Sequence, residues 1–470
     1  MNRDALAGRR ALVMGLGLFG GGVAAARFLA ERGADVTVTD LRDADVLASA
    51  VRALDGVPVR FVLGEHHEDD FRTAELLVVN PAVPRHASLV CLARESGARV
   101  TSEVGLFLDN VRAPVIGVTG TQGKSSTCRF IADLLEACGR RVRLGGNIGR
   151  PLLAEVDEIE PDEFVVLELS SYQLECLPDD VQRERDASAL RVGIITNVLA
   201  DHLERHGTRE AYVAAKLRLL ELLPPGAMVL LPADADWLPG ANALPADVRA
   251  LSFQANPARS VRADSAGGPA HAALHLGDTD FRLGGESLAP FDAAPVLPDF
   301  QRTNLLAALG AARLIGVEPV ELHAALPAVR GLPHRLCDLG ERGARRVFDN
   351  AVSTTPDSTV SALRALEPGM TVLLGGKLKG LDTRELTRVV LERAARAILF
   401  GDAAAAWSAN FRAQGIETHT THTVREALTA AYELSNPGDT LLFSPACPSF
   451  DAYPNFQARA DDFLAALPPR

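Results

Sequence analysis

Short apolar runs rich in β-branched residues recur along the whole chain, and the stretches between them are long enough to form helices. The runs occupy residues 11–15, 36–40, 76–80, 115–120, 164–169, 193–198, 228–232, 371–376, 397–401 and 440–446. Intervening segments such as 128–141 and 425–435 carry apolar residues at helical spacing. Strands that alternate with helices predict parallel sheets, so the expected fold class is α/β throughout.

The length of 470 residues predicts several domains, because a domain usually has roughly 100 to 200 residues. The segment 110–114 (NVRAP) separates the first three apolar runs from the fourth. A region rich in Gly, Ala, Pro and Asp, about residues 255–298, is interpreted as irregular, and a helix is expected to begin after it. We therefore predict three domains, with boundaries at 1–111, 112–298 and 299–470.

Composition restricts the class of partner. With 48 Lys and Arg against 60 Asp and Glu, the formal charge is −12, which argues against a nucleic-acid or anionic-membrane surface. No run of about 20 apolar residues is present, and glycines interrupt the apolar stretch after Arg10 that resembles a signal peptide. The six cysteines are scattered without a CxxC pair, as in reduced cytoplasmic proteins. We expect a cytoplasmic monomer that acts on small molecules, with no nucleic-acid or membrane partner.

The first glycine-rich motif follows the first apolar run. Gly15, Gly17 and Gly20 form GxGxxG between a predicted strand and a predicted helix, and Asp40 ends the next strand. Such glycines let the backbone approach a pyrophosphate at a helix N-terminus, and the acidic residue can accept a hydrogen bond from a ribose or base. The pattern fits either a nucleotide site or a tight turn that serves only the packing of helix and sheet. If the motif is considered by itself, NAD is the default ligand.

A second glycine-rich loop, VIGVTGTQGKSST at 115–127, has the features of a phosphate-binding loop. Backbone N–H groups of such a loop surround phosphates, Lys124 can bridge the terminal ones, and the Ser125 hydroxyl can bind Mg²⁺. Val118 replaces the first glycine of the strict GxxxxGK[ST] pattern, so this is the shorter GTxGK[ST] form. The residues predicted to bind ATP here are Gly120, Thr121, Gln122, Gly123, Lys124, Ser125 and Ser126.

Polar residues follow the next strands of the same predicted sheet. Glu168 ends one strand, where a carboxylate could bind a metal ion. Asn197, Asp201 and His202 come just after the following strand, and Lys216 lies in the next helix. Taken singly, His202 and Lys216 read as ordinary surface residues. Because the ends of parallel strands converge on one crevice, we expect these residues to lie near the phosphate loop.

Several further motifs accompany these loops along the whole chain. They are GGNIG (145–149), LELSSYQLE (167–175), NVLADHLER (197–205), AAKLRL (214–219), TNLLAAL (303–309), GLPHR (331–335), GGKLKG (375–380) and SPACPSFDAYPNF (444–456). Together the motifs resemble those of the Mur ligase family, ATP-dependent amide-forming ligases of peptidoglycan precursor synthesis. The resemblance implies an N-terminal Rossmann-like domain, a central P-loop ATPase-type parallel sheet and a C-terminal Rossmann-like domain.

The resemblance also implies the roles of individual residues. The N-terminal loop would hold the uridine diphosphate group of UDP-N-acetylmuramoyl-L-alanine, through Gly15, Gly17, Gly20, Asp40 and Asn147. Phe19 stands where the family often has a threonine that contacts the diphosphate. The implied catalytic residues are Lys124, Glu168, His202 and Lys216. Two Mg²⁺ ions would be held by Ser125, Glu168, His202 and Lys216, with Lys216 N-carboxylated. Asn304 and Arg335 would also hold ATP.

The implied acceptor site for glutamate is less regular. Its residues by resemblance are Thr354, Lys379, Ser449, Phe450 and Phe456. The family's usual DSKATN segment is replaced by NAVSTT at 350–355, so Asn350 stands in place of an aspartate and Val352 in place of a lysine. We predict D-glutamate as the amino acid added and keep L-glutamate as the alternative. Lys377 is a candidate to compensate for the missing cation.

The predicted function is ligation of D-glutamate to UDP-N-acetylmuramoyl-L-alanine through an acyl phosphate. Three other classes remain open. A folylpolyglutamate synthase-like ligase shares the GTxGK[ST] loop but does not need the N-terminal glycine loop. An NAD-dependent oxidoreductase would leave the phosphate loop and its polar neighbours unexplained. A non-catalytic nucleotide-binding scaffold would account for Asn350 and Val352.

Overall fold

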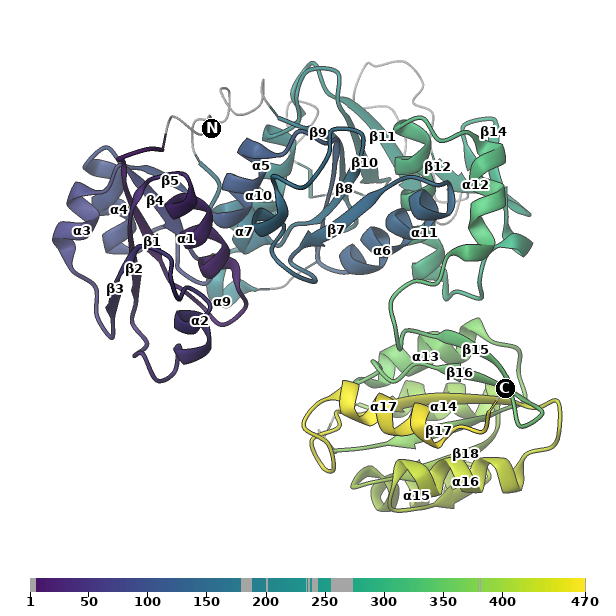
Figure 1. The fold of residues 1–470 in the computed structure, drawn as a ribbon. Coiled ribbons are helices and arrows are strands. Elements are labelled where there is room, and N and C mark those ends of the chain that lie inside the picture. The colour runs from purple at the N-terminus through teal and green to yellow at the C-terminus, as the bar shows by residue number, and fades with distance from the viewer. Residues whose placement is uncertain are drawn as a thin grey trace. The chain divides into compact units, whose positions relative to one another are not determined.

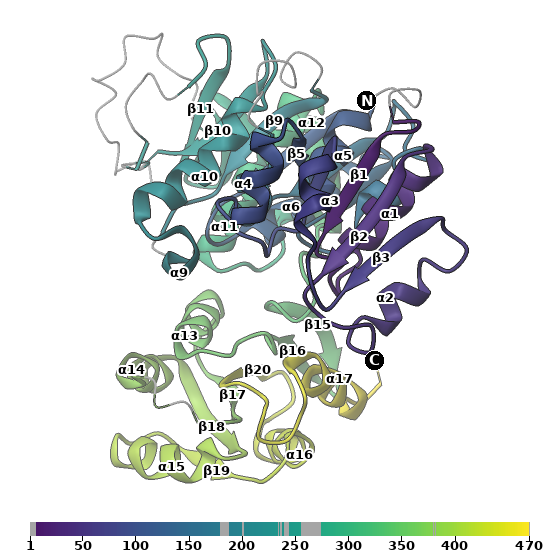
Figure 2. The same ribbon diagram turned by 90° about the vertical axis from the view of Figure 1, so that its left-hand side faces the viewer.

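The chain folds into two compact units, described here from a computed structural model that covers residues 6–178, 188–199, 202–233, 235, 237–238, 244–254, 274–378, 380 and 382–469. One unit comprises Met1–Phe291 with Thr303–Ala325, and the other Asp292–Arg302 with Leu326–Arg470. The first unit contains two sheets and the second contains one, so the protein is a three-domain α/β protein (Figures 1 and 2). Residues 303–325, which the predicted boundary at 299 assigns to the last domain, lie in the first unit. Otherwise the predicted boundaries stay a prediction.

The N-terminal sheet has five parallel strands in the order β3-β2-β1-β4-β5. The strand order reverses beside β1, and ligands of open α/β sheets bind at such a point, outside the carboxyl ends of the strands. The strands are β1 (Arg10–Met14), β2 (Asp35–Asp40), β3 (Val59–Leu63), β4 (Leu76–Val79) and β5 (Arg99–Thr101). The helices are α1 (Gly21–Glu31), α2 (Ala48–Arg52), α3 (Glu68–Thr73), α4 (Ser88–Glu95) and α5 (Glu103–Asn110).

Strand β1 is apolar at successive positions because helices cover both faces of its sheet. Ala11 and Val13 pack into the same core cluster as Phe28 of α1. Leu12 and Met14 belong to a separate core cluster on the other face. Burial on both faces explains why this strand reads as an unbroken apolar run rather than as an alternating one.

The central sheet has the order β14-β13-β12-β11-β10-β9-β6-β8-β7. Strand β6, which leads into the phosphate loop, pairs in parallel with both β8 and β9, as the sequence predicted for the polar strand ends. The strands are β6 (Val115–Thr119), β7 (Val142–Gly146), β8 (Phe164–Glu168), β9 (Leu190–Ile195), β10 (Met228–Pro232), β11 (Arg249–Gln254), β12 (Leu274–Leu276), β13 (Asp280–Leu283) and β14 (Glu286–Pro290). The helices are α6 (Lys124–Ala137), α7 (Ser171–Glu175), α9 (Leu203–His206), α10 (Arg209–Glu221), α11 (Asp299–Leu314) and α12 (Pro319–Ala325), with 3₁₀ turns η2 (Leu152–Glu155), η5 (Phe291–Ala293) and η6 (Leu326–Ala328).

One part of the region expected to be irregular is folded. Strands β12, β13 and β14, which span 274–290, extend the central sheet, and β12 pairs with β13 and β13 with β14 in antiparallel fashion. They are short and joined by tight turns, so they lack the long apolar runs that revealed the parallel strands. The prediction of an irregular segment is therefore wrong for 274–290.

The sheet of the second unit has the order β15-β16-β20-β17-β18-β19. It is parallel except for the hairpin of β15 and β16. The strands are β15 (Cys337–Arg342), β16 (Arg345–Asp349), β17 (Met370–Gly375), β18 (Ala394–Phe400), β19 (Thr418–Thr420) and β20 (Thr440–Ala446). The helices are α13 (Pro356–Ala365), α14 (Arg384–Arg393), α15 (Ala403–Ala413), α16 (Val424–Leu434) and α17 (Phe456–Ala466). Among the described residues of either unit, no helix combines the length and apolar character needed to cross a membrane.

Candidate active site

The phosphate loop turns sharply between β6 and α6, and two glycines make the turn possible. Gly120 has a φ of 147°, and a Cβ there would lie 1.9 Å from the Thr196 hydroxyl oxygen. Gly123 has a φ of 83°, and a Cβ there would lie 2.4 Å from Asn304 Oδ1. The first N–H groups of α6 have no partner within the helix, which is the usual setting for phosphate binding. The predicted ATP residue Asn304 therefore lies directly against this loop.

The end of β9 holds the phosphate loop in place. Asn197 accepts from the Gln122 N–H through Oδ1 at 2.9 Å and donates through Nδ2 to the Gln122 carbonyl at 3.1 Å. The Asn197 carbonyl accepts from the Thr121 N–H at 2.9 Å, and the Thr196 hydroxyl donates to the Gln122 carbonyl at 2.5 Å. Lys124 Nζ donates to the Thr121 carbonyl at 2.9 Å. These hydrogen bonds within the protein fix the shape of the loop.

Glu168 presents a carboxylate oxygen suited to a metal ion. The side chain is buried, and its Oε1 accepts from Asn147 Nδ2 at 2.9 Å. Oε2 is also buried and has no hydrogen-bond partner among the described residues. A buried carboxylate oxygen without a partner is costly, whereas Mg²⁺ prefers such oxygens, so the residue fits a divalent cation. Burial and the charge of Glu168 raise the pKa of the Cys128 thiol well above its usual value, and Lys124 acts in the opposite direction.

Lys216 and His202 border the loop beside two tyrosines. Lys216 is 1% exposed; its Nζ donates to the Gly120 carbonyl at 2.7 Å and lies 4.5 Å from the centre of the Tyr212 ring. The Tyr212 hydroxyl lies 3.0 Å from Thr121 Oγ1. His202 has a φ of 51°, and its Nδ1 lies 3.3 Å from the Tyr172 hydroxyl.

The side chains that most often hold metal ions are those of His, Cys, Asp and Glu. No three such side chains gather into a preformed metal centre within the ranges that the structure describes. Mg²⁺ is commonly held by one or two carboxylates together with substrate phosphates, which agrees with a single buried glutamate. Ser125, whose hydroxyl is predicted to bind Mg²⁺, is the second residue of α6. Asp201 lies outside the described residues.

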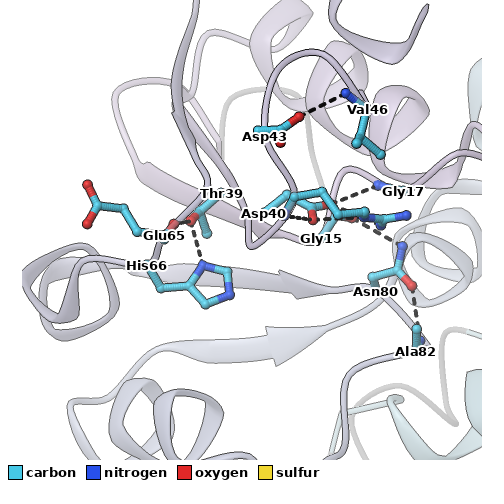
Figure 3. Close-up of polar contacts among 11 residues, drawn as sticks. Gly15, Gly17, Thr39, Asp40, Asp43, Val46, Glu65, His66, Asn80 and Ala82 are labelled. Atoms are coloured by element: carbon cyan, nitrogen blue, oxygen red, sulfur yellow. Dashed lines mark hydrogen bonds and ion pairs between the residues drawn. The ribbon is translucent and has the colours of Figure 1, made fainter. Parts of the chain in front are cut away.

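The N-terminal glycine loop is held by Asp40 and Asn80 (Figure 3). Asp40 Oδ2 accepts from the Gly17 N–H at 3.2 Å, and Oδ1 accepts from the Arg42 N–H at 3.0 Å. Burial alone would raise the pKa of Asp40, but the hydrogen bonds from Arg42 and Gly17 hold it below its usual value. Asn80 Nδ2 donates to the Gly15 carbonyl at 3.1 Å, and a Cβ at Gly15 would lie 2.7 Å from Asn80 Cβ.

A cavity of about 490 Å³ lies beside this glycine loop. Gly15, Gly17 and the fully exposed Phe19 line one side, and Asn147 lines another. Gly20 caps α1, where its Cβ would lie 3.6 Å from Pro151. Because Asn147 also donates to Glu168, one side chain joins the cavity to the edge of the phosphate loop.

In the second unit, the side chains of Arg335 and Asn350 differ in whether their hydrogen-bonding groups have partners within the protein. Burial lowers the pKa of the Arg335 guanidinium, and its Nε is buried without a hydrogen-bond partner among the described residues. Both ends of the buried Asn350 amide have partners within the protein: Oδ1 accepts from the Leu336 N–H at 3.1 Å and Nδ2 donates to Ser444 Oγ at 2.9 Å. Arg335 thus has a buried donor without a partner among the described residues, whereas Asn350 joins Leu336, just after the GLPHR segment, to Ser444 of β20.

The predicted acceptor residues gather partly around the ends of β17 and β20. The Lys377 N–H donates to the Pro448 carbonyl at 2.8 Å, which joins the two loops. Ser449 Oγ is buried without a hydrogen-bond partner among the described residues, and Phe450 is 61% exposed. Phe456 begins α17, and Thr354 lies half-buried just before α13. Lys379 lies outside the described residues.

Sequence reasoning missed four residues that shape these sites. Asn80 and Thr196 carry a usable signal, since Asn80 ends the predicted run 76–80 and Thr196 is a polar residue within the predicted run 193–198. Tyr172 lies inside the quoted LELSSYQLE motif. Tyr212 has no such signal, because it looks like any helical aromatic residue until α10 is placed beside the loop.

Comparison with known proteins identifies the same family over the whole chain. Three family models match: the Mur ligase MurD-like N-terminal domain at 9–102, the Mur ligase middle domain at 118–312 and the Mur ligase glutamate ligase domain at 334–447. The chain is 35% identical to the UDP-N-acetylmuramoylalanine--D-glutamate ligase of Geobacter metallireducens, over 98% of each chain. It is also 35% identical to the ligase of that name from Roseiflexus sp., over 97% of this chain and 98% of that one.

Solved structures agree on the fold. MurF from Acinetobacter baumannii matches with a TM-score of 0.59 and 16% identity, over 97% of this chain and 93% of that one. MurC from Thermotoga maritima matches with a TM-score of 0.52 and 18% identity, over 97% of this chain and 98% of that one. The matched domains and the near-full-length relatives together show that the chain belongs to the Mur ligase family.

Proposed function

We propose that this protein joins D-glutamate to UDP-N-acetylmuramoyl-L-alanine, with ATP cleaved to ADP and phosphate, in peptidoglycan precursor synthesis. The observation that carries the proposal is Asn147, which lines the cavity beside the first glycine loop and donates to Glu168 beside the second. A ligase that phosphorylates one nucleotide-linked substrate with another nucleotide needs this proximity. A dehydrogenase does not. The names of the relatives support the same reaction.

The N-terminal loop takes the UDP-linked substrate. Gly15 and Gly17 allow the backbone to approach the diphosphate, and Gly20 opens α1 behind it. Asp40 accepts hydrogen bonds from the uridine, in place of the contacts it makes to Arg42. Asn147 reaches the same substrate from the central domain.

The phosphate loop takes ATP. Residues 120–126 surround its phosphates, Lys124 bridges the terminal ones, and Asn304 and Arg335 contact the rest of the nucleotide. Two Mg²⁺ ions are proposed, held by Ser125, Glu168, His202 and N-carboxylated Lys216. When bound, Mg²⁺ neutralises negative charge between the γ-phosphate and the incoming carboxylate.

The position of Lys216 supports the proposed carboxylation. The side chain is buried, and its Nζ lies beside the phosphate loop. A neutral amine reacts with CO₂ to give a carbamate and a proton, which turns a cation into an anion beside the phosphate loop. The carbonyl of Gly120, which Nζ contacts, shows how close to that loop the new carboxylate would lie.

The reaction proceeds in two steps. The alanyl carboxylate attacks the γ-phosphorus, the bond to ADP breaks, and Lys124 stabilises the transferred phosphoryl group. The glutamate amine, after losing a proton from its ammonium form, attacks the acyl carbon to give a tetrahedral intermediate. That intermediate expels phosphate and leaves the amide.

Glutamate is received by Ser449, Phe450, Phe456, Thr354 and Lys379. The partnerless Ser449 Oγ supports a polar ligand at this edge of the sheet. L-glutamate is the second candidate, because Val352 offers no charge where the family has a lysine. Losing one charged hydrogen bond costs about 1.5 to 3 kcal/mol, which is enough to change a preference. Lys377 lies in the adjoining loop and could restore the charge.

We also propose a cytoplasmic monomer. All six cysteines are free, as expected in a reducing compartment. The two proposed nucleotide substrates, ATP and UDP-N-acetylmuramoyl-L-alanine, belong to the cytoplasm.

Phosphate release with ATP, UDP-N-acetylmuramoyl-L-alanine and each glutamate enantiomer tests the function. Release that requires the UDP-linked substrate and D-glutamate is expected. A preference for L-glutamate would refute the D assignment alone. Release with a folate in place of the UDP-linked substrate would favour a folylpolyglutamate synthase-like enzyme. Nucleotide binding without turnover would favour a scaffold, and NAD reduction would favour an oxidoreductase.

A further inference from the structure

The cavity beside the N-terminal glycine loop contains one unexpected group, Glu103. It is the first residue of α5, which Ser102 caps, and its side chain lines the cavity. Among the described lining residues it is the only carboxylate, and none of them is a lysine, arginine or histidine. The other polar lining side chains are Asn80, Asn147, Ser170, Tyr172 and Gln173.

The surroundings of Glu103 disfavour a charged carboxylate. Its Oε1 accepts a long hydrogen bond, 3.4 Å, from the Leu153 N–H of η2. Burial raises the pKa of Glu103 to about 7, while the Leu153 bond acts in the opposite direction. Helix α5 packs against α1 and η2. The charged side chains of these elements do not contribute to the pKa shift of Glu103; they are Arg27 and Glu31 of α1, Glu155 of η2 and Asp109 of α5.

An anionic substrate makes the protonation state of Glu103 matter. The proposed substrate carries a doubly charged diphosphate and an alanyl carboxylate, and the described cavity lining offers no cation to offset a fourth negative charge. A carboxylate there would repel the ligand in a partly desolvated space. A neutral carboxyl group instead offers an O–H donor to an acceptor oxygen of the ligand.

We propose that Glu103 is a substrate-binding residue that contacts the UDP-linked sugar as a neutral carboxylic acid and donates a hydrogen bond to it, so that binding takes up one proton. The proton comes from the buffer, and no other bond changes. This inference rests on the proposed function, because it assumes that the anionic sugar nucleotide occupies this cavity.

Titration calorimetry of the full-length protein with UDP-N-acetylmuramoyl-L-alanine tests the proposal. Measured at pH 8 in two buffers of different ionisation enthalpy, the wild type should take up close to one proton per ligand. Its Kd should rise by about tenfold per pH unit above pH 8, as linkage requires for one proton. The ligand's own carboxyl group, with a pKa of about 3.5, does not titrate in this range.

Two variants separate Glu103 from other groups. Glu103→Gln keeps a donor without a titratable proton, so it should bind at pH 8 at least as tightly as the wild type, with no proton uptake and a flat pH profile. Glu68→Gln is the matched control: Glu68 is an exposed glutamate in the first turn of α3, and its variant should behave as the wild type.

Each other result is decisive. Wild-type binding without proton uptake would overturn the role of Glu103 and leave the proposed function intact, and this measurement needs no variant to fold. Uptake that persists in Glu103→Gln would assign the proton to another group and also overturn the inference. A wild type that does not bind the UDP-linked sugar would refute the proposed function, and the inference with it.

Discussion

The two glycine loops end in the same backbone conformation but differ in the side chains that surround them. Each follows an interior strand that has a parallel neighbour on both sides, and each ends in a left-handed glycine that caps a helix, Gly20 with a φ of 85° and Gly123 with a φ of 83°. Beside the second loop lie Lys124, Lys216 and the buried Glu168. The cavity beside the first has no cation in its described lining. Under the proposed function, the first loop holds the UDP-linked substrate and the second takes part in phosphoryl transfer, and the neighbouring side chains account for the difference.

The largest expected difference between the loops is at Lys124. Lys124→Ala should lower kcat by about 10³-fold or more, because it removes the charge that stabilises the transferred phosphoryl group. Binding of the UDP-linked sugar, measured by calorimetry, should be unchanged. Arg129→Ala, farther along the same helix, should retain turnover. Near-normal phosphate release by folded Lys124→Ala would contradict the phosphate-loop assignment.

Lys216 tests the chemistry at the same loop from the other side. Lys216→Ala should be nearly inactive and should regain part of its activity when formate or acetate is added, because the missing group is a carboxylate. Activity against carboxylate concentration, with circular dichroism as the check on folding, measures this. A Lys216→Ala protein with normal activity would rule out the carbamate.

At the first loop the expected effect is on binding rather than on chemistry. Gly15→Ala places a Cβ 2.7 Å from Asn80 Cβ at a φ of 89°, so the loop must shift. Substrate affinity should fall by about 10- to 100-fold, the equivalent of about 1.4 to 2.8 kcal/mol, while kcat at saturation changes less. Gly21→Ala is the matched control, because nothing lies within 4 Å of its added methyl group. Equal effects of the two variants on KM would remove the special role of Gly15.

The smallest expected effect concerns stability and pH at Glu103. Its pKa is about 7 in the folded protein against 4.5 ordinarily, so the stability that its protonated form provides is present below pH 4.5 and lost as the pH rises through 7. Glu103→Gln stays neutral and should therefore match the wild type near pH 4.5 and exceed it at pH 8, by about 1 to 3 kcal/mol. Thermal unfolding at the two pH values measures this. If the difference in stability between Glu103→Gln and the wild type is the same at the two pH values, Glu103 is an ordinary, exposed carboxylate.

Burial decided which elements the sequence could predict. Strands β6, β8 and β9 are buried on both faces, read as continuous apolar runs, and lie within a few residues of their predicted positions. Strands β3 and β7 are only partly buried and contain arginine, so they gave no such run. The antiparallel strands at 274–290 were missed because their short segments lie in a region rich in turn-forming residues.

The candidate site divides in a similar way. Residues that lie at or shortly after the end of a strand in the sequence, such as Glu168 and Lys124, were predictable because parallel strands bring their ends together. Contacts across the fold were not, among them Tyr212 to Thr121 and Asn304 to Gly123. The proximity of Asn147 to Glu168 depends on the pairing of β7 with β8, and β7 was not predicted.

The most direct test of the account is the fate of an oxygen atom. UDP-N-acetylmuramoyl-L-alanine labelled with ¹⁸O in its alanyl carboxylate should transfer one labelled oxygen to the phosphate released, since that carboxylate attacks the γ-phosphorus and its oxygen leaves with the phosphate. The other labelled oxygen should remain in the amide carbonyl. Phosphate that carries no label would show that water attacks ATP, and would contradict a transfer reaction between the ligands of the two glycine loops.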